Sequence, residues 1–306
     1  MKHLIYLKWV FLLSIIVVSG SLFAGPGLAE NKIIIRDSLG REVVFAKRPR
    51  TVVSGAPSVS EIIFALGKEA DLIGRTDYCD YPEDVKKIAS IGGLQNPNIE
   101  KIIQLNPDVV IVSTHFKSEH IELLESLGIK LVAFYNDQSF EGVHEIIEKI
   151  AALFDLEAKG RELNESIRSD VAWVKDAMAK TRTRPKVYYV IGFGPSGDFT
   201  SGGNTFIHQL LEMAGGENIA AELKGWAFSF EKIVEADPDI IICSQFWGAK
   251  KDLEAAEGYR DLRAVKNGSV FEIDNNMLDR QGPRTAKGLM ALVEIIHPEL
   301  FLSETQ

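Results

Sequence analysis

Two segments of the chain, 131 residues apart, repeat one another without a gap. The first is Asn98–His115, NIEKIIQLNPDVVIVSTH, and the second is Ser229–Phe246, SFEKIVEADPDIIICSQF. Seven of the eighteen aligned positions are identical, and four of the others exchange one aliphatic residue for another. Each copy predicts a short helix, a Pro-Asp turn and an aliphatic strand that is buried on both faces of a parallel sheet. We therefore expect two similar lobes of doubly wound α/β structure.

Further aliphatic runs alternate with helical patterns, as this fold class requires. The expected strands are Val52–Ser54, Leu72–Thr76, Leu131–Tyr135, Val187–Gly192 and Val270–Ile273. The expected helices are Ser58–Leu66, His120–Leu127, Thr205–Ala214 and Arg284–Ile296. A hairpin, IIIRDSLGREVVF, is expected around Asp37–Gly40.

A single long helix is predicted between the two lobes, over Glu157–Thr181. Its apolar residues fall on one face, because they are spaced by three or four. They are Leu163, Ile167, Val171, Val174 and Met178. At 1.5 Å per residue such a helix would span roughly 37 Å. We therefore expect lobes at 30–155 and 183–306, joined by a stiff linker helix at 156–182, with a ligand cleft between the lobes.

The first 29 residues are predicted to be a cleaved signal peptide. Lys2 and Lys8 flank the start of an apolar run from Trp9 to Val18, and small residues precede a cleavage site after Ala29. A retained membrane anchor is the alternative, but the run is shorter than the ~20 residues of a bilayer span. The segment has no cysteine to carry a lipid, so we expect a periplasmic location. Loss of its two lysines changes the formal net charge from −9 to −11, which argues against nucleic-acid binding.

Two further patterns have more than one interpretation. Cys79 and Cys243 could form a disulfide in an exported protein or remain two separate thiols. Gly192, Gly194 and Gly197 have the G-x-G-x-x-G spacing of a dinucleotide-binding turn. A loop rather than a helix is expected after the third glycine, so we favour a close backbone approach over nucleotide binding.

The residues that follow the expected strands predict the ligand cleft, since ligands of open α/β sheets bind beyond the carboxyl ends of the strands. Many of them are aromatic, which is typical of sites for large ligands with flat surfaces. Two arginines suggest an anionic group on that ligand, although single rings could instead pack the sheet ends. The candidates in this set are Tyr78, His115, Tyr135, Phe199, Phe246, Trp247, Asn276, Arg280 and Arg284.

Motifs throughout the mature chain resemble those of the periplasmic binding proteins that serve importers of iron-siderophore, haem and cobalamin. The matching segments include DSLGREVVFAKRPRTVVSGAPSVSEIIFALG, TDYCDYP, NPNIEKIIQLNPDVVIV, FTSGGNTFIHQLLEMAGGENI, SFEKIVEADPDIII and GPR. The resemblance implies two α/β lobes bridged by one rigid helix. It also implies an ABC permease with two-fold symmetry, and its ATPase, as partners.

The resemblance assigns a role to one acid in each repeat. In the cobalamin-binding relatives, one acid per lobe docks onto arginines of the transporter, and these acids match Glu100 and Glu231. The alternative is that both are helix-start carboxylates stabilised by the helix dipole.

The resemblance leaves the ligand open between a ferric siderophore and a corrinoid, with haem as a third case. Tyr78 and Arg280 match the corrin-binding branch, and Trp226 lies one place from another of its tryptophans. Leu94 and Ser113 replace two aromatic residues of that branch, and Asn276 replaces an acid. An anionic ferric chelate would suit Arg280 and Arg284.

No resident cofactor or metal is expected. His115 could be an axial ligand to haem iron or cobalt, but a hydrogen-bonding side chain at the rim is the ordinary alternative. No nucleophile elbow, zinc-helix motif or paired-carboxylate signature indicates an enzyme. An exported α/β enzyme and a solute sensor that signals to a membrane receptor remain the other function classes.

Overall fold

A computed structural model describes residues 32–135 and 138–302 of the chain. The predicted signal peptide, residues 1–29, lies outside the described residues. Among the residues that are described, no helix has both the length and the apolar character needed to cross a membrane.

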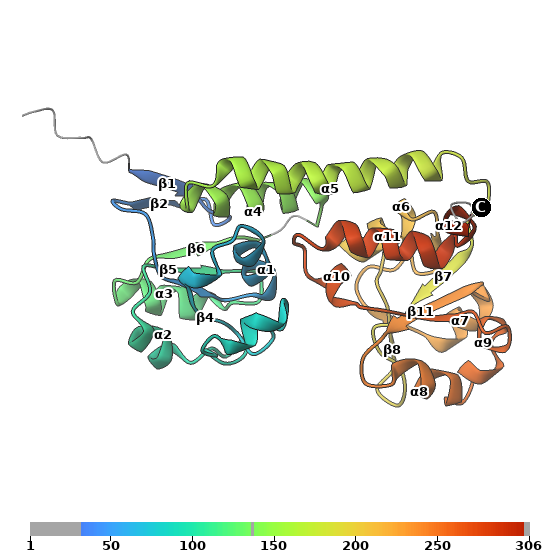
Figure 1. Ribbon diagram of the computed structural model, residues 1–306. Helices are drawn as coiled ribbons and strands as arrows, with labels where there is room; N and C mark the ends of the chain where they lie inside the picture. Colours follow the sequence, from blue (N-terminus) through green and yellow to red (C-terminus); the bar gives the residue numbers. More distant parts are fainter. Residues whose placement is uncertain (1–31, 136–137, 303–306) are drawn as a thin grey trace, which may run out of the picture. The chain divides into compact units, whose positions relative to one another are not determined.

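Two four-stranded parallel sheets form the framework of the protein, as the repeat predicted (Figure 1). The first has the order β4–β3–β5–β6, with β3 at Val52–Ser54, β4 at Leu72–Gly74, β5 at Val109–Val112 and β6 at Leu131–Ala133. The second has the order β9–β7–β11–β12, with β7 at Lys186–Tyr189, β9 at Glu217–Asn218, β11 at Ile240–Ser244 and β12 at Val270–Ile273. Both sheets therefore have the same strand order, and β5 and β11, the strands of the repeat, occupy the same place in it. We call the structure around each sheet the N-terminal and the C-terminal lobe.

The helices of the repeat begin and end in the same way. They are α2, Ile99–Leu105, and α7, Phe230–Ala236. The side chains of Asn98 and Ser229 cap them by accepting hydrogen bonds from backbone amides of the first turn. Asn106 and Asp237 end them in the left-handed conformation, each with φ of 46°.

The aspartate of each Pro-Asp turn ties its strand to a neighbour. Asp108 Oδ2 accepts hydrogen bonds from the amides of Arg50, at 2.7 Å, and Thr51, at 3.0 Å, just before β3. Asp239 Oδ2 accepts a hydrogen bond of 2.8 Å from the amide of Lys186, the first residue of β7. These bonds lower the pKa of Asp108, because they favour the charged carboxylate. The repeat is therefore a structural unit in which the aspartate satisfies backbone donors at the start of the adjacent strand.

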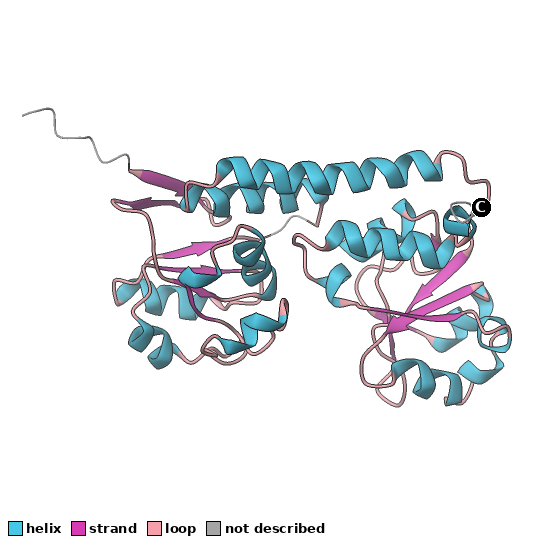
Figure 2. Ribbon diagram, in the orientation of Figure 1, coloured by secondary structure: helices cyan, strands magenta, loops and turns pink. Residues whose placement is uncertain are grey.

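Helices cover both faces of each sheet (Figure 2). In β5, Val109 and Ile111 face the core that contains α1 and α4, whereas Val110 and Val112 face the core that contains α2 and α3. Burial on both sides explains why the strand has no polar residue. The remaining helices of these layers are α1 Pro57–Ala65, α3 Ser118–Ser126, α4 Phe140–Leu153, α6 Phe206–Met213, α8 Ala249–Ala255, α9 Arg263–Lys266 and α11 Thr285–Ile296.

The long helix α5, Glu157–Met178, contributes side chains to the cores of both lobes. Ile167 is buried in the N-terminal core and Val174 in the C-terminal core. Val171, between them, packs against both. The helix contacts α4 and α11, and Figure 1 shows α4 running beside it. The predicted helix was right in kind and start, and the observed one ends three residues earlier.

A hairpin of β1, Ile33–Arg36, and β2, Glu42–Phe45, docks onto the N-terminal lobe through Asp37. The buried carboxylate accepts hydrogen bonds from the backbone amides of Leu39 and Arg41, the Arg41 guanidinium and the Ala133 amide of β6. Burial alone would raise the pKa of Asp37, but the hydrogen bonds from Arg41 and Ala133 outweigh it and lower the pKa.

We predict that Asp37→Asn destabilises the protein by about 2 kcal/mol at pH 7, because charged hydrogen bonds to a buried group are lost. The folded-state pKa of Asp37 is depressed, so its contribution is complete above the unfolded-state pKa and is lost as the pH falls below about 4. Urea unfolding at pH 7 and pH 3 measures both effects, and the difference between wild type and variant should shrink at pH 3. Asp176→Asn, at an exposed position on α5, is the control. A difference that stays constant with pH would contradict the assignment.

Candidate functional site

Three large aromatic side chains stand exposed in loops that follow the sheets. Tyr78 is 58% exposed, Trp226 is 51% exposed and Trp247 is 88% exposed. Folded proteins normally cover rings of this size, because each can remove 150–250 Å² from water. Aromatic side chains line many ligand sites, so these three exposed rings are candidates for ligand contact.

Trp247 comes directly after Phe246, which follows β11, and the two rings lie 5.7 Å apart. The backbone of Trp247 has φ of 60°, in the left-handed region that bulky residues seldom adopt. Such a conformation costs of order 1–3 kcal/mol, and residues that adopt it cluster at functional sites. A tryptophan that is both exposed and in this conformation has no evident role in stabilising the lobe.

Phe199 belongs to a small antiparallel pair of strands, β8, Asp198–Phe199, and β10, Ala227–Phe228, and Trp226 directly precedes β10. The amide of Thr200 donates a hydrogen bond of 2.8 Å to the carbonyl of Trp226, which holds the start of β10 against the end of β8. The side chain of Phe199 is partly buried. The pairing of β8 with β10 therefore brings together two candidate ligand residues that are 27 positions apart in the sequence.

The glycine-rich segment before β8 is a loop and not a nucleotide-binding turn, as expected. Gly194 and Gly197 have φ of 112° and 103°, which only glycine adopts freely. The chain then enters β8, and the next helix, α6, starts only at Phe206. No helix N-terminus follows the third glycine, so the feature that binds a pyrophosphate is missing from this motif.

The other strand-end candidates occupy varied positions. His115 is exposed in the turn after β5. Asn276 is the first residue of α10, Asn276–Asp279, and its backbone amide donates a hydrogen bond of 3.1 Å to Asp274 Oδ1. Tyr135 follows β6 and is partly buried, which raises the pKa of its phenol. Its backbone is held by Ser38 through an amide-to-hydroxyl bond of 2.8 Å.

The two arginines of the predicted cleft have partners within the chain. Arg284 forms a bidentate pair with Glu61 of α1, with its Nε and Nη2 each 2.8 Å from a carboxylate oxygen. Arg280 also reaches Glu61, at 3.2 Å, and pairs with Asp80. Asp274 accepts a further bond of 3.1 Å from Arg284. The contacts with Glu61 and Asp80 join acids of the N-terminal lobe to arginines of the C-terminal lobe.

The acid partners were missed in the sequence analysis. Glu61 carried a usable signal, because it lies among the apolar residues Val59, Ile62 and Ile63 of a short helix, where an unpaired buried charge would be costly. Tyr81 was also missed, although it lies in the TDYCDYP motif. The guanidinium carbon of Arg284 lies 4.0 Å from the centre of the Tyr81 ring, a cation–π distance.

The two candidate docking acids occupy equivalent positions. Glu100 is the second residue of α2 and Glu231 the second residue of α7, and both are exposed. An acid in the first turn of a helix also interacts favourably with the helix dipole, so this geometry suits either role.

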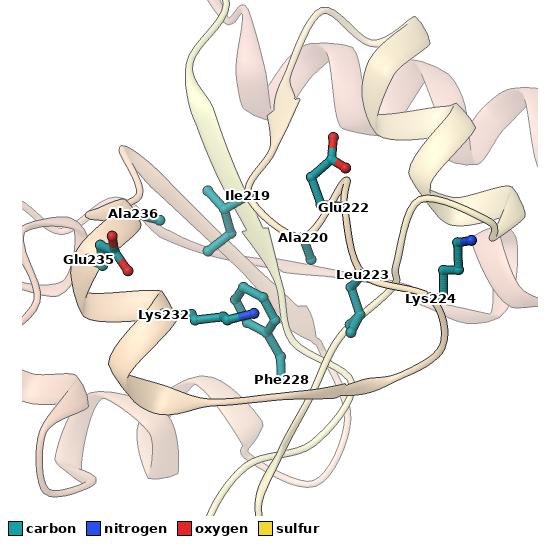
Figure 3. Close-up of a pocket in the computed structure, with 9 residues that line it drawn as sticks. All are labelled: Ile219, Ala220, Glu222, Leu223, Lys224, Phe228, Lys232, Glu235 and Ala236. Atoms are coloured by element: carbon teal, nitrogen blue, oxygen red, sulfur yellow. The ribbon is translucent and has the colours of Figure 1, made fainter.

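A hollow of about 520 Å³ lies beside α7 and contains none of the predicted ligand residues. Figure 3 shows Phe228 and Lys232 on one side of it and Leu223 on another. The two copies of the repeat differ at this point: Ala236 lines the hollow, whereas the equivalent residue of α2, Leu105, packs into the N-terminal core. Both acidic and basic side chains line the hollow, and the ammonium group of Lys232 lies over the Phe228 ring. This combination does not indicate a specific ligand.

The two cysteines are separate and buried thiols, which resolves the alternatives left by the sequence. Cys79 is hydrogen-bonded to Ser60 and Thr76, and burial raises the pKa of Cys243 to about 11. In the part of the chain that the structure describes, no cluster of histidine, cysteine and acidic side chains could hold a metal ion.

Comparison with known proteins finds one family over most of the chain. Residues 52–277 match the family model described as periplasmic binding protein. An uncharacterized ABC transporter substrate-binding lipoprotein of Bacillus subtilis is 33% identical over 276 residues, covering 88% of this chain and 87% of the relative. A cobalamin-binding protein of Halobacterium salinarum is 27% identical over 277 residues, covering 85% of this chain and 73% of the relative. Among solved structures, a periplasmic heme-binding protein from Roseiflexus has a TM-score of 0.76 and is 24% identical. The match covers 81% of this chain and 98% of that chain, and it shows a similarity of fold.

We predict that Gly203→Ala disrupts the loop that carries Trp226. The amide of Gly203 bonds the Leu223 carbonyl at 2.9 Å, and a Cβ on Gly203 would lie 1.9 Å from the Ala221 carbonyl oxygen. Backbone must move to admit the methyl group, so a loss of about 3 kcal/mol is expected in urea unfolding. Gly93→Ala is the control, because an added Cβ meets no atom within 4 Å there. Equal stability of the two variants would contradict this close approach.

Proposed function

This chain belongs to the periplasmic binding protein family, and on that premise we propose that it captures a large metal chelate and delivers it to an ABC importer. A corrinoid is the ligand that we propose first. The importer consists of a membrane permease with two-fold symmetry and its ATPase. The permease opens the cleft and takes the ligand. The binding protein itself performs capture and not chemistry.

The observation that carries the proposal is the set of exposed rings at Tyr78, Trp226 and Trp247. Flat aromatic surfaces bind a flat macrocycle by stacking and by removing apolar surface from water. A small polar solute would need convergent hydrogen-bond donors and acceptors instead. The name of the Halobacterium relative, a cobalamin-binding protein, supports the same choice.

A ferric siderophore is the second candidate, and its main support in the sequence was the pair of arginines. Arg280 and Arg284 already have carboxylate partners within the chain, so their guanidinium groups are not available to an anionic chelate. Haem is the third candidate, in which the exposed His115 could reach a metal. These three ligands have distinct absorption bands, so the spectrum of protein purified from its native host separates them.

We propose that the protein acts outside the cytoplasm, with lobes at 30–155 and 183–306 and the linker helix at 156–182. The Bacillus relative is named a lipoprotein, whereas the predicted leader here contains no cysteine for lipid attachment. We therefore propose a periplasmic protein that is released by signal cleavage.

We predict that Trp247→Ala weakens binding of cyanocobalamin at least about tenfold, since truncating a stacking tryptophan should remove about 1.4 kcal/mol or more of binding free energy. Isothermal titration calorimetry measures the dissociation constants. Trp173→Ala, on α5, is the control and should bind as wild type does. Failure of the wild type to bind any corrinoid, haem or ferric chelate would overturn the proposed function.

We predict that Glu100→Lys combined with Glu231→Lys abolishes uptake while leaving the dissociation constant of the ligand nearly unchanged. Charge reversal replaces attraction to a basic transporter surface with repulsion. Radiolabelled uptake into cells, compared with binding to the purified variant, measures the two properties. Reversal of Glu122 and Glu257, two other exposed acids, is the control. Normal uptake by the Glu100/Glu231 variant would contradict docking.

A further inference from the structure

Glu61 is a carboxylate with unusual surroundings for a helix residue. Its side chain is 2% exposed, and each of its oxygens accepts a charged hydrogen bond. Oε2 binds Arg284 Nε at 2.8 Å, and Oε1 binds Arg284 Nη2 at 2.8 Å and Arg280 Nη1 at 3.2 Å. Such a fork-to-fork arrangement is the strongest and most directional ion pair that arginine makes.

The remaining faces of the two guanidinium groups are also occupied. Arg280 donates to Asp80 and, at 3.1 Å, to the carbonyl of Tyr78. Arg284 donates to Asp274 and lies over the Tyr81 ring. Burial lowers the pKa of each arginine, but the acids outweigh it and raise both, so the cations stay charged.

The charges within this cluster are two positive and three negative, counting Glu61, Asp80 and Asp274. To bind Arg284, an anionic ligand would have to displace the buried carboxylate of Glu61 from a bidentate pair. Leaving that carboxylate without a partner costs several kcal/mol, so the exchange is unfavourable. A ligand without negative charge is not subject to this cost.

We propose that Glu61 determines the charge specificity of the cleft, by holding Arg280 and Arg284 in internal pairs so that metal chelates without net negative charge are selected. The inference rests on the proposed function, since it concerns the ligand of the same cleft. Removing the Glu61 charge while keeping the shape of its side chain should free guanidinium donors for an anionic chelate.

Two probes of opposite character test this inference. Cyanocobalamin has no net charge, and a ferric tris-catecholate complex carries three negative charges. For wild type we expect measurable binding of the first and weak binding of the second. In Glu61→Gln, the ratio of the tris-catecholate dissociation constant to the cyanocobalamin dissociation constant should fall at least about tenfold, or about 1.4 kcal/mol. Glu165→Gln, which removes an exposed acid from α5, should leave that ratio unchanged.

Circular dichroism melting establishes whether Glu61→Gln is folded. If it is not, Asp80→Asn is the second test, because the Asp80 side chain is 44% exposed and the substitution removes one of the two carboxylate partners of Arg280, leaving the pair with Glu61. Its ratio should shift in the same direction by a smaller factor. An unchanged ratio in the folded variant, or tight binding of tris-catecholate by wild type, would overturn the role of Glu61. Absence of cyanocobalamin binding in wild type would instead overturn the proposed ligand. The role of Glu61 would then be tested by comparing the tris-catecholate dissociation constants of wild type and variant.

Discussion

A buried carboxylate requires cationic partners, and the partners of Glu61 lie more than 200 residues away in the sequence. That requirement joins α1 of the N-terminal lobe to the segment between β12 and α11 of the C-terminal lobe. It also decides the electrostatics of the same region, because the pairs that connect the lobes use up the arginines that would otherwise attract an anion. The interaction that holds the two parts together is therefore the one that limits what can be bound beside it.

The second connection, helix α5, acts through packing. Ile167 and Val174 are buried in different cores, and Val171, about one turn from each, packs against both. Because protein cores are close-packed, the helix cannot bend between these anchors without opening a gap in one of them. Two connections of different kind, one polar and one apolar, restrict relative motion of the lobes more than a flexible hinge would. Small closure on ligand binding is consistent with that restraint.

Local patterns in the sequence predicted the elements that depend on local physics. The repeat, the hairpin and the long helix follow from periodicity, and Val52–Ser54 and Val270–Ile273 were predicted to the residue. The two-residue strands β8 and β10 were missed, because two residues carry no alternation to detect. The pairing of Arg284 with Glu61 depends on which lobe surfaces meet, which no spacing in the sequence specifies. The sequence could therefore place the arginines at a strand end but could not predict that they were already paired.

The two copies of the repeat carry the same acid at the start of the helix but differ in the shape of the surface beside that helix. Glu100 and Glu231 occupy the same position on matching helices, yet Ala236 leaves a hollow beside one helix where Leu105 fills the other. Electrostatic attraction acts over several ångströms and depends weakly on fine surface contour, whereas van der Waals fit is lost within one. A partner with two-fold symmetry can thus meet both acids equally even though it cannot fit both surroundings equally. Recognition by charge at two matched points is the form of docking that we propose for such a pair of lobes.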